Sequence, residues 1–325
     1  MNDKQFDILV VGELNVDLIL NKIEGTPVLG KEVFSRDMVM TLGSSSAIFA
    51  NNLSVLGTSV SFLGRVGQDN FADLVCSSLE QSGVDISSLI YSSKSNTGIT
   101  VAMSYGDDRA MVTYPGAMSD LTVDDIQDKD LNRARHLHVS SIFLQESLLP
   151  GVHLLFERAK KLGLTTSLDP QWDPSEKWDV DLEALLPNVD VFLPNEAELM
   201  HMTRASSVQE GMDKILPFCN HVAVKRGVQG AILYTEGMQI VEPALLNDDV
   251  VDAIGAGDSF NAGFIHAFLL NQPLTVCLET GIVTGAINTT AAGGTGAFTS
   301  MEEVSRLALD NYNFKLKDKL REEKV

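Results

Sequence analysis

The residues best suited to chemistry lie in the segment 252–260, which reads DAIGAGDSF. Its loop glycines precede residues 259–270, whose composition predicts a helix. Backbone N–H groups at a helix start, together with the helix dipole, form a site for anions such as a phosphoryl group. Asp258 stands at the rim of that site, where a carboxylate either accepts a proton in a reaction or caps the helix. The segment therefore favours phosphoryl transfer, with capping as the structural alternative.

Two pairs of polar residues also have spacings that chemistry uses. Asn195 and Glu198 lie three apart at the start of a predicted helix, and this pattern alone favours a capping box. Asn15 and Asp17 alternate along a strand end, so both point to one face. That pair suits either sugar hydroxyls or a turn. The loop 169–173 follows a predicted strand at the sheet edge where α/β proteins bind ligands, so a substrate contact and a plain loop both stay open.

Short apolar strands alternate with helical patterns, which predicts a parallel sheet covered on both faces. The predicted strands are 6–11, 59–63, 136–139, 164–168, 189–193 and 221–224. The predicted helices are 71–81, 148–162, 196–202, 208–218 and 259–270. Residues 16–40 and 97–114 have a β-ribbon pattern instead, with a turn at 105–109. These ribbons form either a small lid sheet or an edge hairpin. No linker divides the chain, so one domain is expected over residues 1–325.

Composition and charge exclude several classes of protein. The 325 residues carry 24 Lys and Arg against 44 Asp and Glu, a net charge of −20, which repels nucleic acid and anionic membrane surfaces. The three cysteines are far apart and form no metal-binding pattern, which favours a reducing compartment. The sequence shows neither a signal peptide nor an apolar run that would span a bilayer. We therefore expect a cytoplasmic protein with no nucleic-acid or membrane partner.

Two common nucleotide-binding motifs fail. Residues 25–31 approach a P-loop, but Glu32 stands where a Ser or Thr must hold magnesium. Only Gly12 follows the first strand, so the dinucleotide fingerprint is missing and a dehydrogenase is disfavoured.

Several motifs, in the right order from residue 9 to about 298, resemble those of the ribokinase-like (PfkB) carbohydrate kinases. GAGDSF at 255–260, preceded by Asp252, is similar to the family's second signature, D-T-x-G-A-G-D-x-F, with Ala253 where Thr is usual. PNEAEL at 194–199 matches its N-x-x-E motif. The family's first strand resembles LVVGELNVDL at 9–18, and its nucleotide-side strand and turn resemble VAVKRGVQG at 222–230. Its first signature is similar to the segment 43–69, and its lid hairpin is similar to 106–117. Ser44 and Ile48 depart from the first signature's second glycine and sugar-binding Asn, which affects sugar specificity more than kinase chemistry.

The resemblance implies a ribokinase-like α/β fold, a three-layer sandwich with a central, mostly parallel sheet and a small β-sheet lid at about 16–40 and 97–117. It implies an ATP-dependent kinase that uses Mg²⁺ and transfers the γ-phosphate to a primary hydroxyl of a small sugar or sugar acid. Ribose, fructose and 2-keto-3-deoxygluconate are acceptors of that type. A nucleoside kinase of the same fold and a catalytically silent sugar-binding sensor are the alternatives. Lids of this family sometimes form dimer interfaces, which leaves a homodimer open.

The resemblance also assigns roles to residues. Asp258 would accept the proton of the acceptor hydroxyl, and Gly255, Ala256 and Gly257 would supply backbone donors. The implied acceptor-binding residues are Asn15, Asp17, Gly43 and Arg109. The implied nucleotide-binding residues are Asn195, Lys225, Gly227, Gly230, Asn261 and Asn288. Glu198 would hold Mg²⁺ through water, and Asp252 and Ile254 would bind a monovalent cation such as K⁺.

Overall fold

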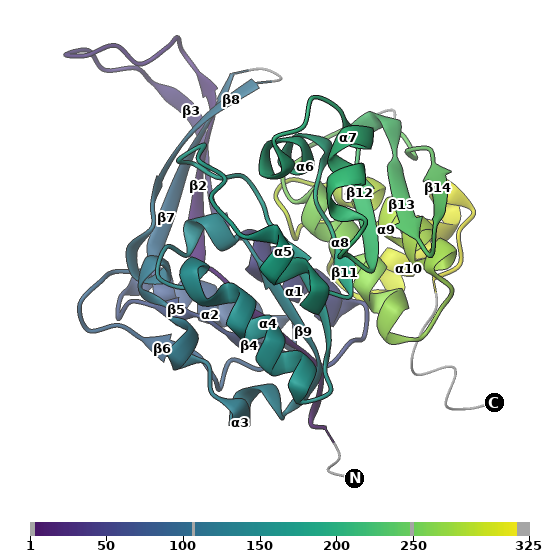
Figure 1. Ribbon diagram of the computed structural model, residues 1–325. Helices are drawn as coiled ribbons and strands as arrows, with labels where there is room; N and C mark the ends of the chain where they lie inside the picture. Colours follow the sequence, from purple (N-terminus) through teal and green to yellow (C-terminus); the bar gives the residue numbers. More distant parts are fainter. Residues whose placement is uncertain (1–3, 106–107, 248–249, 317–325) are drawn as a thin grey trace.

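The computed structural model describes residues 4–105, 108–247 and 250–316, and two sheets organise them. The main sheet has the strand order β14-β13-β12-β11-β10-β9-β1-β4 (Figure 1). Neighbouring strands from β4 to β12 pair in parallel, whereas β12–β13 and β13–β14 are antiparallel. The strands are β1 Phe6–Val11, β4 Val60–Leu63, β9 Ala134–Ser140, β10 Thr165–Asp169, β11 Val191–Phe192, β12 His221–Lys225, β13 Ala231–Thr235 and β14 Met238–Glu242.

Helices cover both faces of the main sheet because its strands are apolar on both sides. Ile8 and Val10 of β1 pack into one core, and Leu9 and Val11 pack into the other. The first core is closed by α1 Ser45–Val55, α2 Asn70–Gln81, α8 Ala256–Leu269, α9 Leu274–Asn288 and α10 Met301–Tyr312. The second is closed by α3 Asp128–Leu131, α4 Val152–Lys161, α5 Leu182–Leu185, α6 Glu196–Thr203 and α7 Val208–Ile215. The result is a sandwich of three layers.

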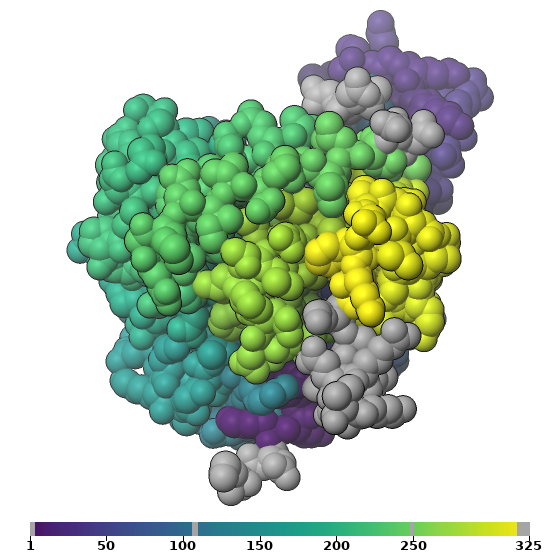
Figure 2. All heavy atoms as spheres, turned by 90° about the vertical axis from the view of Figure 1, so that its right-hand side faces the viewer, coloured from purple at the N-terminus to yellow at the C-terminus, as the bar shows by residue number. Residues whose placement is uncertain are grey.

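A second sheet, which we call the lid sheet, stands away from this body (Figure 1). Its strand order is β3-β2-β7-β8, and its β2–β3 end projects beyond the body (Figure 2). The strands are β2 Asn15–Ile23, β3 Ser35–Leu42, β7 Gly98–Tyr105 and β8 Asp108–Tyr114. Two short strands, β5 Arg65–Val66 and β6 Ile90–Tyr91, form a separate two-stranded sheet. In the register of the lid sheet, Asp17 lies opposite Thr100, and Thr100 opposite Thr113. One face of the lid sheet therefore carries a polar row.

The expected mostly parallel sheet and the two β-ribbons are confirmed, but several boundaries were wrong. The expected helix 259–270 begins at Ala256, because Gly255 forms its N-cap. The expected strand 189–193 pairs only over Val191–Phe192. The turn residues 106 and 107 of the expected hairpin lie outside the described residues. Among the helices that the structure describes, none is long and apolar enough to cross a membrane.

Candidate active site

The N-terminal end of α8 presents backbone N–H groups at the edge of the main sheet. Gly255, the N-cap, has φ +76°, and a Cβ atom there would lie 2.5 Å from Cα of Gly294. A Cβ atom on Gly257 would meet nothing closer than Nζ of Lys225 at 3.8 Å. Glycine at 255 is therefore required by the backbone, whereas glycine at 257 leaves open space over the first turn.

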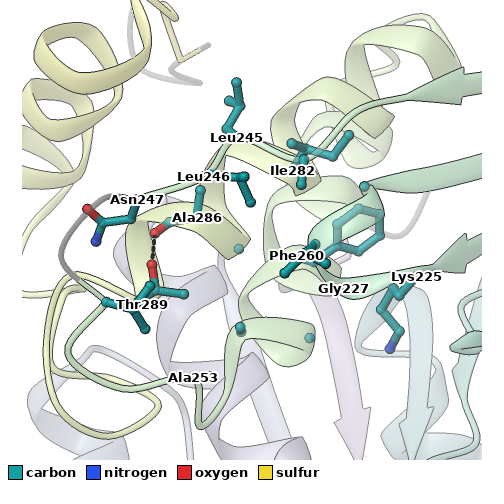
Figure 3. Close-up of a pocket in the computed structure, with 17 residues that line it drawn as sticks. Lys225, Gly227, Leu245, Leu246, Asn247, Ala253, Phe260, Ile282, Ala286 and Thr289 are labelled. Atoms are coloured by element: carbon teal, nitrogen blue, oxygen red, sulfur yellow. Dashed lines mark hydrogen bonds between the residues drawn. The ribbon is translucent and has the colours of Figure 1, made fainter.

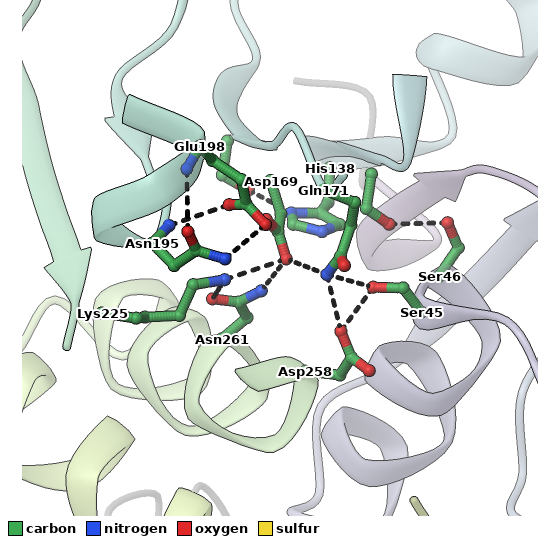
Figure 4. A network of polar contacts seen from close by, with 12 residues as sticks. Ser45, Ser46, His138, Asp169, Gln171, Asn195, Glu198, Lys225, Asp258 and Asn261 are labelled. Carbon is green, nitrogen blue, oxygen red and sulfur yellow. Dashed lines mark hydrogen bonds and ion pairs between the residues drawn. The ribbon is translucent and has the colours of Figure 1, made fainter. Parts of the chain in front are cut away.

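Asp258 lies in this first turn, and its side chain points into a polar network instead of capping α8 (Figure 4). Ser45 donates a hydrogen bond to Oδ1 of Asp258, and Nε2 of Gln171 lies 3.1 Å from the same oxygen. Burial and the nearby carboxylate of Asp169 raise the pKa of Asp258 to about 7. The capping alternative for Asp258 is therefore wrong, and its carboxylate is poised to exchange a proton near neutral pH.

Asp169, at the end of β10, is the centre of the network and is fully buried. Its Oδ2 atom accepts hydrogen bonds from Gln171 at 2.8 Å, Lys225 at 3.1 Å and Asn261. Its Oδ1 atom is also buried and has no hydrogen-bond partner in the described protein. Burial alone would lower the pKa of Lys225, but the charges of Asp169, Glu198 and Asp258 outweigh burial and raise it. Lys225 therefore stays charged among three acids.

Asn195 and Glu198 form a reciprocal capping box at the start of α6. Glu198 N donates to Asn195 Oδ1 at 2.8 Å, and Asn195 N donates to Glu198 Oε2 at 2.8 Å. Burial and the charge of Asp169 raise the pKa of Glu198. The capping geometry is thus present, and it holds a buried acid beside Asp169 and Lys225.

Three of the four implied acceptor residues, Asn15, Asp17 and Gly43, lie together where β2 begins and β3 ends. Nδ2 of Asn15 donates to Oγ1 of Thr100 at 2.8 Å and to Oδ1 of Asp17 at 3.2 Å. A Cβ atom on Gly43 would collide with the Asp17 carboxylate. Glycine at position 43 therefore allows the Asp17 side chain to adopt its observed position. Arg109 lies in β8 opposite Ser104, and its side chain is outside the described part of the structure.

An apolar pocket of about 340 Å³ lies on the other side of the α8 start (Figure 3). Lys225, Gly227, Gly230, Ala256 and Gly257 line it, as the predicted nucleotide and phosphate sites require. The remaining lining is mostly apolar and includes Val228, Leu245, Leu246, Phe260, Ile282 and Ala286.

Three of the implied nucleotide residues do not line this pocket. Asn195 belongs to the capping box, and Asn261 bonds to Asp169 and Lys225. Asn288 is fully buried, where Nδ2 donates to the Ile254 carbonyl at 2.6 Å and Oδ1 accepts from Ser259 at 2.8 Å. These hydrogen bonds connect Asn288 to the loop before α8 and to its first turn.

The implied cation ligands, Asp252 and Ile254, lie in the loop that leads into α8. Asp252 accepts hydrogen bonds from the backbone N–H groups of Ile254 and Gly293, each at 2.9 Å. Asp252 therefore ties the loop before α8 to the Gly-rich turn at 293–296. The carboxylate and the Ile254 carbonyl retain lone pairs for a cation.

Sequence reasoning missed Ser45, and it named Asp169 and Gln171 only as part of a loop that could contact substrate. Ser45 begins α1, and Gln171 has φ +59° in the loop after β10. Both contact Asp258 across more than 80 residues of sequence, which no local pattern reveals. The one available signal was position, because Asp169 ends a parallel strand at the ligand-binding edge.

Comparisons with known proteins identify the family and the fold. A family model described as "pfkB family carbohydrate kinase" matches residues 5–300. A 5-dehydro-2-deoxygluconokinase of Geobacillus thermodenitrificans is 25% identical over 318 residues, which are 93% of each chain. The fold is similar to that of Arabidopsis thaliana ribokinase complexed with ribose and ATP, with a TM-score of 0.82 and 23% identity over 93% of this chain and 98% of that one. A putative ribokinase II of E. coli, in complex with ATP and Mg²⁺, has a TM-score of 0.78 and 23% identity, and covers 93% of this chain and 98% of its own. The predicted ribokinase-like fold is confirmed.

Proposed function

The chain belongs to the pfkB family of carbohydrate kinases, and we propose that it transfers the γ-phosphate of ATP to a primary hydroxyl group of a small sugar or sugar acid. One observation carries the proposal. Ala256 and Gly257 line the apolar pocket, whereas the next residue, Asp258, contacts Ser45 and Gln171 on the opposite side. A nucleotide in the pocket and an acceptor beside the lid sheet would therefore meet at the first turn of α8.

In this mechanism Asp258 orients the acceptor hydroxyl and takes its proton as the bond to phosphorus forms. The backbone N–H groups of residues 255–257 donate to the transferring phosphoryl group, whose charge the helix dipole also stabilises. Lys225 adds positive charge between the pocket and the network. Exclusion of water by the lid sheet would favour transfer to the sugar over hydrolysis.

The acids beside this site suit Mg²⁺ that is held through water molecules, not by direct ligands. The described residues contain no group of three or more His, Cys, Asp or Glu side chains that would hold a metal directly. The unpartnered, buried Oδ1 atom of Asp169 and the nearby Glu198 suit a metal-bound water instead. When bound, Mg²⁺ would neutralise negative charge on the transferring phosphoryl group.

The experiment that tests the proposal is an ATP-consumption screen across sugars, sugar acids and nucleosides, with Asp258→Asn as the inactive control. Turnover with a sugar supports the proposal, and turnover with nucleosides alone would identify a nucleoside kinase. Saturable sugar binding without any turnover would identify a sensor. Ile48 stands where the family's first signature has its sugar-binding Asn, and it is buried against Gly294. Because this position offers no amide to the sugar, the panel must include many sugars.

We also propose that a monovalent cation such as K⁺ binds between Asp252, the Ile254 carbonyl and the turn at 293–296. The support is the pair of hydrogen bonds that already joins these segments. K⁺ should raise both activity and melting temperature relative to tetramethylammonium at equal ionic strength. Equal values in the two salts would exclude the cation site.

The outer face of the lid sheet is proposed as a homodimer interface. Met38, Met40, Val112 and Tyr114 lie on that face and are exposed, opposite the polar row. Light scattering after gel filtration should show a dimer that Met40→Glu weakens, and a monomer at high protein concentration would contradict it.

The three free cysteines support a reducing compartment, for which we propose the cytoplasm.

A further inference from the structure

A second cavity, of about 1100 Å³, lies beside the lid sheet and is not used by the mechanism above. Met111 and Thr113 of β8 form one side of it, Glu146 and His153 another, and the loop 172–181 a third. Ligand pockets usually have volumes of about 300–1000 Å³. The cavity therefore has room for more than one sugar ring.

Two chains of contact connect this cavity to Asp258 and to the polar row of the lid sheet. Gln171 bonds to Asp258, and the next residue, Trp172, lines the cavity. On the lid sheet, Thr113, which also lines the cavity, lies 3.0 Å from Thr100 between hydroxyl oxygens. Thr100 in turn accepts from Asn15. An acceptor held by the polar row would therefore have the cavity as its neighbour.

The loop that bounds the cavity is held in a costly conformation. Gln171, Glu176 and Trp178 all have positive φ angles, between 54° and 59°, although none is glycine. The buried carboxylate of Asp173 fixes the loop by accepting from Ser175 N at 2.8 Å and Trp178 N at 2.7 Å. Backbone strain of this kind persists where the surroundings enforce it, and it concentrates at ligand sites.

Trp172 is the side chain that this loop presents to the cavity. Its ring contacts Trp178 edge-to-face at 5.0 Å between centroids and His201 at 5.4 Å. Trp178 is itself stacked on His201 with an angle of 7° between planes. Trp172 nevertheless remains 45% exposed. The loop thus holds an indole in a fixed orientation with a free surface.

The chemistry of the lining suits carbohydrate better than a nucleobase. Glu146, His153, Lys177 and Asp179 line the cavity and offer hydrogen bonds of both kinds to hydroxyl groups. The nucleotide pocket, by contrast, is mostly apolar, as a planar base requires. Glu146, Asp179 and Asp181 place more negative than positive charge in the cavity, which disfavours anionic acceptors.

We propose that this cavity is a subsite for a second sugar ring that stacks on Trp172, so that the preferred acceptor is a neutral disaccharide or similar glycoside. The inference rests on the proposed function because it places the first ring at the polar row beside Asp258. It narrows the acceptor class from small sugars in general to neutral sugars that carry a second ring.

Fluorescence tests binding to this subsite without reference to catalysis. Trp172 and Trp178 are the only tryptophans of the sequence, so intrinsic emission reports on this loop alone. Titration with sucrose, maltose, cellobiose and trehalose should give a saturable change with at least one of them. The same sugar should change the emission of Trp172→Phe far less, because Trp178 is 5% exposed. Glucose and fructose serve as single-ring comparisons.

Kinetics then tests whether the subsite serves the reaction. The measured quantity is the ratio of kcat/KM for the best disaccharide to kcat/KM for its single-ring component. Trp172→Ala should lower this ratio about tenfold, since stacking on an aromatic ring contributes about that factor or more. Glu146 is exposed and lines the cavity, and Glu146→Gln keeps the shape of the side chain while it removes the charge. This variant should lower the ratio less than Trp172→Ala does. Retention of the melting temperature in Glu146→Gln keeps the test valid if Trp172→Ala does not fold.

The outcomes separate this inference from the proposed function. Phosphorylation of single sugars with no fluorescence response to any disaccharide and an unchanged ratio in both variants would overturn the subsite and leave the kinase intact. A disaccharide response that depends on Trp172, without turnover of any sugar, would support the subsite and overturn the kinase proposal. A response to adenosine or uridine stronger than to any disaccharide would overturn the inference in favour of a nucleoside.

Discussion

Asp258 and Asp169 are two buried carboxylates that share one amide donor. Nε2 of Gln171 lies 3.1 Å from Oδ1 of Asp258 and 2.8 Å from Oδ2 of Asp169. Asp169 is further neutralised by Lys225, whereas Asp258 has no direct ion pair among the described residues. The two acids therefore differ in their ion pairing, and burial together with the charge of Asp169 raises the pKa of Asp258 to about 7.

Replacement of Asp258 by Asn should lower kcat by about 10²–10⁴-fold, because the acceptor hydroxyl loses the group that orients it and takes its proton. The affinity for ATP should change by less than about threefold, since the apolar pocket is lined by Ala256 and Gly257 and not by Asp258. Steady-state kinetics and ATP titration measure the two effects. A kcat close to that of the wild type would remove Asp258 from catalysis.

Activity should depend on the protonation of Asp258. Only the ionised carboxylate accepts a proton, so kcat/KM for the acceptor should rise about tenfold per pH unit below pH 7 and level off above it. The matched variant Asp258→Asn should show no such limb in its residual activity. A wild-type profile that is flat from pH 5.5 to 8 would contradict the assignment.

The same shift has a consequence for stability, with the opposite trend in pH. The folded protein binds the Asp258 proton more tightly than the unfolded chain, whose pKa is near 3.8. Stability from this group is therefore present below about pH 4 and is lost as the pH rises to 7. Asp258→Asn should raise the melting temperature at pH 8 by about 2–6 °C and leave it nearly unchanged at pH 4, with an intermediate rise at pH 5–6. Equal effects at pH 8 and pH 4 would contradict the linkage.

Lys225 should stabilise the fold chiefly through Asp169. Lys225→Met leaves Asp169, Glu198 and Asp258 without their shared cation and should reduce the free energy of unfolding by about 3–5 kcal/mol at pH 8. The double variant Lys225→Met, Asp169→Asn should recover part of that loss. Urea unfolding of the wild type and three variants measures the coupling, for which we expect about 1–3 kcal/mol. Additive losses would show that the pair is independent.

The sequence predicted six of the eight strands of the main sheet because they are short apolar runs such as Phe6–Val11, but it did not predict the antiparallel strands β13 and β14 at one edge. It did not predict α9, Leu274–Asn288, whose small and apolar residues are buried nearly all round and show no amphipathic period. The start of α8 was placed three residues late because Gly255 caps it with a positive φ instead of a polar side chain. The family motif identified Asp258 as a candidate catalytic residue. Ser45 and Gln171 become candidates only through their contacts with Asp258, which join segments far apart in the sequence. A single sequence does not reveal such contacts.

The apolar pocket beside α8, which we propose as the nucleotide site, should discriminate weakly between bases. Its described lining is mostly apolar, and the hydroxyl of Thr289 already donates to the Ala286 carbonyl at 2.8 Å. Asn247 and Thr289 are the neutral polar side chains of its described lining, and a pocket with so few polar groups imposes only small penalties on a polar variant of the base. We expect kcat/KM for GTP within about tenfold of that for ATP, measured with one acceptor at saturation. A preference for ATP above a thousandfold would mean that polar groups read the base.

Two glycines at the start of α8 provide a test that separates folding from phosphate binding. Gly255→Ala should reduce the free energy of unfolding by about 1–3 kcal/mol, because φ is +76° and the new Cβ atom would meet the Gly294 backbone. Gly257→Ala should retain or raise stability, since its Cβ atom has room and alanine favours a helix. If the triphosphate approaches this turn, the methyl group at 257 should still raise the KM for ATP by about tenfold or more. Gly257→Ala with wild-type KM and kcat would place the phosphates elsewhere.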